Sequence, residues 1–195
     1  MRRGRRSGCF TIVAVHSTVR GPALGGCRLW HYDDSRAAVR DALRLSGAMT
    51  LKSAVAGLPL GGGKGVIMAP DPAAAGDREW RADALRDFGD TVQSLGGSYI
   101  TAEDVGTSSR DMETISLSTS HVTGLSRRLA GSGDPSPWTA LGVQTAIRRP
   151  GRSRPRSPSP AWATSAAASR PPVRRPARRC SSPTSTRASA RSPTA

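Results

Sequence analysis

The sequence has 195 residues, with 29 Lys and Arg against 14 Asp and Glu, for a formal net charge of +15. No stretch is long and apolar enough to span a membrane, and none resembles a cleavable signal sequence. The three cysteines, Cys9, Cys27 and Cys180, lack the C-x-x-C spacing of a zinc site and are too scattered for a disulfide framework. We therefore expect a cytoplasmic protein with reduced thiols, no bound metal and no membrane partner.

Residues 10–148 alternate between patterns typical of strands and patterns typical of helices. In chain order we expect a strand over 10–15, a helix over 35–49, a strand over 66–68, a helix over 80–95, a strand over 99–101, and helices over 109–117 and 136–147. Ser35 is the expected cap of the first helix, Leu43 is expected on its buried face, and Gly61-Gly62-Gly63 is the expected break before the second strand. Strands separated by helices predict an α/β domain.

The two ends of the sequence differ from this middle segment. Residues 1–9 are rich in arginine and are expected to have no fixed structure. Residues 149–195 contain 11 Arg and no Asp or Glu, and most of the rest are Pro, Ser and Ala. Because few large apolar side chains are present to offset the entropy of ordering, we expect this tail to be disordered.

Only two lysines occur in the sequence, Lys52 and Lys64, and both lie between Met49 and Ile67. Three glycines precede Lys64, but a phosphate-binding loop needs Ser or Thr after the lysine, and Gly65 stands there. A second interpretation is a lysine pair in a closed cleft, where burial and like charge favour a neutral amine on one lysine while the other binds a carboxylate. The remaining alternative is two solvated surface lysines.

Four segments together resemble a known family. They are G21-P-A-L-G-G-C-R-L-W30, the run from Asp41 to Ile67, Y99-I-T-A-E-D-V-G-T107 and G131-S-G-D-P-S-P-W-T-A-L-G-V143. In this order and near this spacing they are similar to the leucine, valine and phenylalanine dehydrogenase branch of the Glu/Leu/Phe/Val dehydrogenases. The resemblance covers about residues 10–148 and implies the substrate-binding and oligomerisation domain of an NAD-dependent enzyme. Such an enzyme would deaminate an apolar L-amino acid to its 2-oxo acid and ammonia, as a homo-oligomer.

The resemblance implies separate roles for the charged residues of these segments. Lys64 would activate the water that attacks the imino-acid carbon, and Lys52 would bind the substrate α-carboxylate beside a close backbone contact from Gly25 and Gly26. Asp104 would exchange a proton with the substrate amine. Without the rest of the motif, a turn or helix-capping aspartate would be the favoured interpretation of Asp104.

Three further residues are candidates for contacts with the apolar part of the substrate or with the cofactor. Leu24 stands where glutamate-specific relatives carry a lysine, so the resemblance implies an apolar wall that excludes glutamate. Met49 is expected to line the same cleft or, alternatively, to be plain helix core. Thr139 resembles the residue that contacts the nicotinamide amide, with an ordinary first-turn helix threonine as the alternative.

The sequence departs from this family after residue 148. The family continues into a Rossmann domain with G-x-G-x-x-G, and no such motif occurs here; the basic tail stands in its place. Reading residues 157–169 and 180–186 one nucleotide out of frame permits a strand, the fingerprint and a second strand ending in acids, so we interpret the tail as the product of a frameshift near residues 148–155. The chain would then be a truncated, inactive form. Two alternatives stay open: an Arg-rich tail that binds nucleic acid or an acidic surface, and a non-catalytic partner of an intact dehydrogenase.

Overall fold

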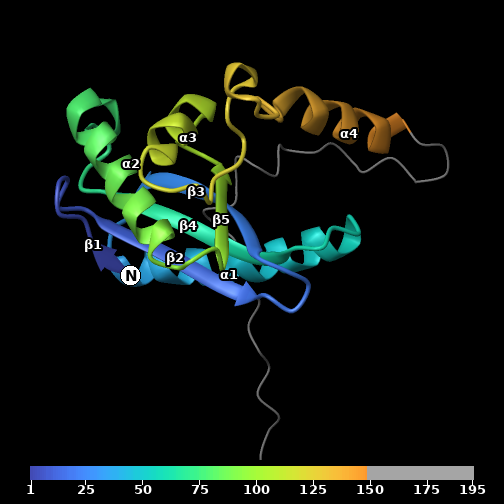
Figure 1. Ribbon diagram of the computed structural model, residues 1–195, viewed down its shortest axis with the longest axis horizontal. Coiled ribbons are helices and arrows are strands. Elements are labelled where there is room, and N and C mark those ends of the chain that lie inside the picture. Colours follow the sequence, from blue (N-terminus) through green and yellow to red (C-terminus); the bar gives the residue numbers. More distant parts are fainter. Residues whose placement is uncertain (149–195) are drawn as a thin grey trace, which may run out of the picture. The chain divides into compact units, whose positions relative to one another are not determined.

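A five-stranded mixed sheet lies at the centre of the computed structural model, which describes residues 1–148 (Figure 1). Its strands, in the spatial order β1-β2-β4-β3-β5, are β1 (Arg2–Arg3), β2 (Phe10–Ser17), β4 (Gly61–Ala69), β3 (Ala23–His31) and β5 (Tyr99–Glu103). β2 runs antiparallel to β1 and β4, whereas β3 runs parallel to β4 and β5. The expected α/β class is therefore confirmed.

Helices cover both faces of this sheet. The helices are α1 (Ser35–Val55), α2 (Arg78–Gln93), α3 (Ser109–Ser116) and α4 (Ser136–Arg148), with short 3-10 turns η1 (Ala74–Gly76) and η2 (Arg127–Leu129). α1 packs on one face through a small core, and α2 and α3 pack on the other through a larger one. In Figure 1, α2 and α3 lie together on the side of the sheet away from α1.

β4 is buried along nearly its whole length because it is the middle strand and both of its faces are covered. Successive side chains of a strand point to opposite faces. Val66 accordingly packs with Ile12 and Ala42 on the α1 side. Its neighbour Ile67 joins the larger core on the opposite side, together with the ring of Phe88.

The expected strands over 10–15, 66–68 and 99–101 and the expected helices over 80–95, 109–117 and 136–147 are confirmed, but α1 differs in three ways. Asp34, not Ser35, caps it, with a side-chain oxygen 2.7 Å from the backbone N of Ala37. The helix continues to Val55. Leu43 is 59% exposed, because the face that packs on the sheet carries small residues, Ala38, Ala42, Ser46 and Ser53.

The expectation that Gly61-Gly62-Gly63 interrupts the structure is wrong, since all three glycines lie within β4. They allow close packing on both faces of the strand. A Cβ added to Gly62 would stand 2.1 Å from the backbone N of Thr50 in α1, and one added to Gly63 would stand 2.6 Å from the ring of Tyr99. β3 was not expected at all, because Pro22 and the Gly25-Gly26 pair hide its pattern.

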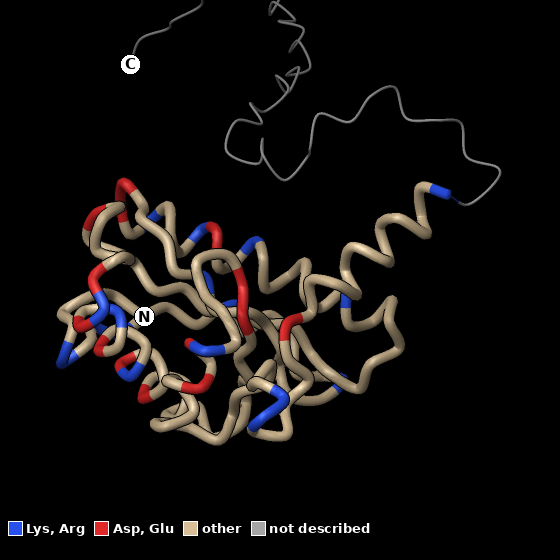
Figure 2. Tube along the Cα trace, turned by 90° about the horizontal axis from the view of Figure 1, so that it is seen from above, with Lys and Arg blue, Asp and Glu red and all other residues tan. Residues whose placement is uncertain are grey.

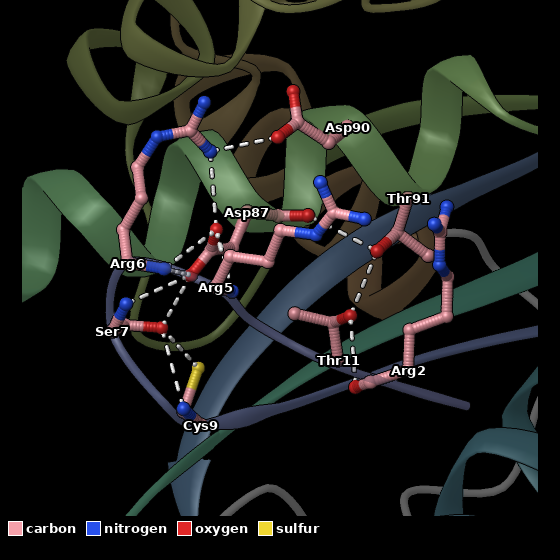
Figure 3. Close-up of polar contacts among 9 residues, drawn as sticks. All are labelled: Arg2, Arg5, Arg6, Ser7, Cys9, Thr11, Asp87, Asp90 and Thr91. Atoms are coloured by element: carbon pink, nitrogen blue, oxygen red, sulfur yellow. Dashed lines mark hydrogen bonds and ion pairs between the residues drawn. The ribbon is translucent and has the colours of Figure 1, made fainter.

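The expectation that residues 1–9 have no fixed structure is also wrong. Arg2 and Arg3 pair with β2, and the next residues bind the carboxylate of Asp87 on α2 (Figure 3). This carboxylate accepts hydrogen bonds from the backbone N of Arg5, Arg6 and Ser7 at 3.2, 3.1 and 2.9 Å, from the Ser7 hydroxyl at 2.8 Å and from the Arg6 guanidinium at 3.0 Å. A buried acid on a helix therefore fixes this basic segment.

Basic and acidic residues are interspersed along residues 1–148 (Figure 2). No helix in the described part is long and apolar enough to cross a membrane. α4 buries none of its side chains. The expected disorder of residues 149–195 and the frameshift proposed for them lie outside the described residues.

Candidate functional site

A cavity of about 330 Å³ opens on the face of the sheet that α1 partly covers. Its walls come from β3, β4, the end of β5, the last turns of α1 and the loop between residues 123 and 135. Seven of the eight residues singled out from the sequence line it: Leu24, Gly25, Gly26, Met49, Lys52, Lys64 and Asp104. Segments more than 100 residues apart in the sequence, from Leu24 to Pro135, thus meet at one place.

The strand register explains why these side chains converge. Leu24 is paired with Gly62, and Arg28 with Val66. Because every second side chain of a strand points to the same face, these four positions of β3 and β4 all face α1. Lys64, midway between Gly62 and Val66, shares that face. Cys27 is paired with Glu103 at the end of β5. The next residues of the two segments, Arg28 and Asp104, therefore lie side by side.

Lys64 is buried and paired with a carboxylate. Only 4% of its surface is exposed, and its Nζ lies 2.5 Å from Oδ2 of Asp104. Burial lowers the pKa of Lys64 below that of a free lysine, although the charge of Asp104 opposes this shift. The arrangement favours a lysine that can give up its proton at a lower pH than usual.

Lys52 has a different environment. It lies in the last turn of α1 and is exposed, and no hydrogen-bond or ion-pair partner for it is present among residues 1–148. Lys52 lines the same cavity as Lys64. A lysine with this exposure can bind an anion that enters the cavity, because the anion has no intramolecular competitor within the described residues.

Gly25 and Gly26 line the cavity, but the structure gives them a second role in packing. A Cβ on Gly25 would stand only 1.7 Å from the carbonyl oxygen of Gly63. A Cβ on Gly26 would stand 2.7 Å from Cβ of Asp104. Gly26 therefore makes room for the acid, and both glycines let neighbouring strands and the Asp104 turn approach closely.

Thr139 lies apart from the other candidates. It is exposed in the first turn of α4, and its hydroxyl donates to the carbonyl oxygen of Pro135 at 3.1 Å. It does not line the cavity. The structure thus shows the ordinary helix threonine that was the alternative interpretation, and a contact with a cofactor stays a prediction.

Sequence reasoning missed the polar residues that hold Asp104. The Thr107 hydroxyl accepts from the backbone N of Asp104 at 2.9 Å and donates to the carbonyl oxygen of Cys27 at 2.7 Å. Arg28 donates from Nε to Asp104 at 3.1 Å and from Nη1 to Asp41 on α1 at 2.7 Å. Arg28 directly follows the Gly-Gly-Cys run, but the strand pairing that places it beside Asp104 was not visible in the sequence.

Comparisons with known proteins agree with this fold. Residues 1–121 match the model of the Glu/Leu/Phe/Val dehydrogenase dimerisation domain. A leucine dehydrogenase of Bacillus subtilis is 49% identical over 143 residues, which are 73% of this chain and 38% of that protein. A valine dehydrogenase of Streptomyces virginiae is 45% identical over 74% of this chain and 39% of its own length.

A solved structure, that of L-tryptophan dehydrogenase from Nostoc punctiforme, superposes with a TM-score of 0.58 at 40% identity, covering 72% of this chain and 37% of that one. The chain thus spans about two fifths of the length of the curated relatives that it matches. The match to the family model covers well over half of the sequence and includes Leu24, Lys52, Lys64 and Asp104. The chain belongs to the Glu/Leu/Phe/Val dehydrogenase family.

Proposed function

We propose that the cavity binds an apolar L-amino acid and the corresponding 2-oxo acid, as the substrate site of an NAD-dependent oxidative deamination. The observation that carries the proposal is the contrast between the two lysines. One exposed lysine and one buried lysine paired with a carboxylate border the same cavity. The names of the relatives, leucine, valine and L-tryptophan dehydrogenase, support a substrate with an apolar side chain.

Each charged residue takes one step in this proposal. Lys52 binds the substrate α-carboxylate. Lys64, whose pKa is lowered by burial, takes a proton from the water that attacks the imino carbon. Asp104 exchanges a proton with the substrate amine, because its carboxylate borders the cavity and is 24% exposed. Leu24 and Met49 form part of the apolar wall beside the substrate side chain.

Nothing among the described residues identifies a site for NAD. The hydroxyl of Thr139 is engaged by the helix backbone, and no G-x-G-x-x-G loop occurs in the sequence. NAD is therefore proposed from family membership; when bound, it would accept the hydride that leaves the substrate α-carbon as the imine forms. We propose accordingly that residues 1–148 supply the substrate site, and that the protein self-associates through the segment that matches the dimerisation domain.

Calorimetric titration of the full chain with the 2-oxo acid of leucine tests the binding proposal. The wild-type protein should bind, and Lys52→Gln should weaken binding at least tenfold, since a charge-assisted contact is lost. Arg40→Gln is the matched control, because it removes one exposed positive charge from the same helix outside the cavity. Absence of binding by the wild type, or equal loss in both variants, would refute the proposal.

A further inference from the structure

The carboxylate of Asp104 is shared between two cations that bind the same oxygen. Lys64 Nζ lies 2.5 Å from Oδ2, and Arg28 Nε lies 3.1 Å from that atom. Within residues 1–148, no donor is within hydrogen-bonding distance of the other oxygen, Oδ1. Because Asp104 lines the cavity, two cations on Oδ2 leave Oδ1 as the oxygen free to meet a ligand.

Arg28 is itself held in place from α1. Its Nη1 donates to Oδ2 of Asp41 at 2.7 Å, and that same oxygen accepts the hydroxyl of Tyr32 at 2.9 Å. Arg44 binds the outer oxygen of Asp41 at 3.0 Å. The side chain of Asp41 is only 17% exposed, so this anchor is largely protected from water.

The planar guanidinium group suits this position. Nε and Nη1 point along different directions of a rigid fork, so one Arg28 side chain reaches a carboxylate on the β5 side and another on α1. A lysine ammonium is a single point charge and cannot fix both groups in this way. The result is an alternating row of charges, Lys64, Asp104, Arg28 and Asp41, that runs from the cavity to the helix.

We propose that Arg28 is a positioning residue for this site, which bridges Asp104 and Asp41 and thereby turns Oδ2 of Asp104 toward Lys64 and Oδ1 toward the substrate amine. The proposal rests on the function proposed above for Asp104. Arg28 does not line the cavity, so it acts through the carboxylate rather than on the substrate. It also ties the strand that carries Leu24 to the helix that carries Lys52.

The bridge has an electrostatic consequence for Lys64 that can be measured. The charge of Arg28 adds to burial in lowering the pKa of Lys64, and Asp104 opposes both. Removing Arg28 takes away a like charge and leaves Asp104 to Lys64 alone, so the pKa of Lys64 should rise. The other ionisable groups around Lys64 are Cys27, Lys52 and Glu103, and none of them is substituted in the variant that lacks Arg28.

The composition of the chain makes the measurement simple. Because only Lys52 and Lys64 are present, biosynthetic labelling with carbon-13 lysine gives two side-chain signals in an NMR spectrum of the full chain. Lys52→Arg assigns them. A pH titration of the Lys64 signal is then compared between the wild type, Arg28→Gln and the matched control Arg44→Gln, which removes a 62% exposed arginine from the outer side of Asp41.

The expected result is a Lys64 titration midpoint at higher pH in Arg28→Gln and an unchanged midpoint in Arg44→Gln. If Arg28→Gln does not fold, Arg28→Met carries the test, because methionine removes the charge but keeps an unbranched side chain that fills the space, and the midpoint should again rise. An unchanged or lower midpoint in either folded variant overturns the proposal. Adding the 2-oxo acid of leucine to the wild type tests the underlying function separately, since failure to shift either lysine signal would refute substrate binding only.

Discussion

Replacing Asp87 by alanine should loosen the N-terminal segment from α2 and destabilise the whole domain. The side chain of Asp87 is 3% exposed and is bound by five donor groups of Arg5, Arg6 and Ser7 (Figure 3). Each hydrogen bond to a charged group contributes about 1.5 to 3 kcal/mol. These contributions cannot simply be summed, because the segment can detach and let water bind its amides. We expect a loss of about 3 to 5 kcal/mol, the range found when one partner of a buried ionic contact is removed.

Urea unfolding at neutral pH measures this loss as a lower midpoint concentration with an unchanged slope. Asp90→Ala is the matched control. Asp90 lies on the same helix and binds the same Arg6 at 2.7 Å, but its side chain is 50% exposed, so we expect a cost below about 1 kcal/mol. If Asp87→Ala cost no more than Asp90→Ala, the N-terminal segment would not be held by the buried acid.

The same carboxylate should make stability depend on acid. Burial raises the pKa of Asp87, but hydrogen bonds from Ser7 and Arg6 outweigh burial and hold that pKa below its usual value. A carboxyl with a lowered pKa in the folded state stabilises the protein fully above its unfolded pKa of about 3.9. This contribution is lost as the pH falls through the lowered folded value. The difference in unfolding free energy between wild type and Asp87→Asn should therefore shrink below about pH 4; a constant difference down to strongly acidic pH would contradict this.

Three other substitutions test the packing and the cavity. Gly65→Ala places a Cβ 2.5 Å from the ring of Phe88 and should lower the stability by about 1 to 3 kcal/mol in thermal unfolding. Gly76→Ala is the control and should be close to neutral, because no atom lies within 4 Å of the added Cβ. Equal effects of the two substitutions would exclude close packing as the cause. Tyr99→Phe removes a buried hydrogen bond to a carbonyl of β3 and should cost about 1 to 3 kcal/mol in urea unfolding, and a stability equal to wild type would show that the carbonyl finds another donor. Leu24→Lys adds a cation to the cavity and should raise the affinity for 2-oxoglutarate relative to the 2-oxo acid of leucine in competition calorimetry, and an unchanged ratio would place Leu24 away from the substrate side chain.

Local patterns in the sequence predicted the four α-helices of the described residues and the strands over 10–15, 66–68 and 99–101, because the hydrophobic periodicity of each segment indicates its own structure. The helical spacing of Trp80, Ala84 and Phe88 is an example, and the structure confirms α2 there. The same reasoning failed where tertiary packing overrides local preference. β3 and the start of β4 are strands in spite of Gly25-Gly26 and Gly61-Gly62-Gly63, since their backbones pair and their neighbours leave no room for side chains.

The candidate site, like the fold, was predicted only in part from local patterns in the sequence. Lys52 and Lys64 stand out by their scarcity and by the motifs around them, so the sequence alone pointed to the residues that line the cavity. The sequence did not reveal the role of Arg28. Its partner Asp104 is 76 residues away, and its other partner, Asp41, lies on α1. Which strands are neighbours, and in which register, is decided by the whole fold rather than by any local pattern.

The glycines around Lys64 are explained by the burial of a charge rather than by the approach of a phosphate. Lys64 lies in the central strand, where α1 covers one face and aromatic rings cover the other, and the adjacent glycines permit both contacts. A lysine in that position must either lose its proton or meet an anion, because burying an unpaired ammonium is costly. Asp104 supplies the anion, and Arg28 binds the same oxygen of Asp104 and adds a like charge that lowers the pKa of Lys64. The strand packing that buries this lysine and the ion pairs that adjust its pKa are therefore parts of one arrangement, and a change in either should be detected at Lys64.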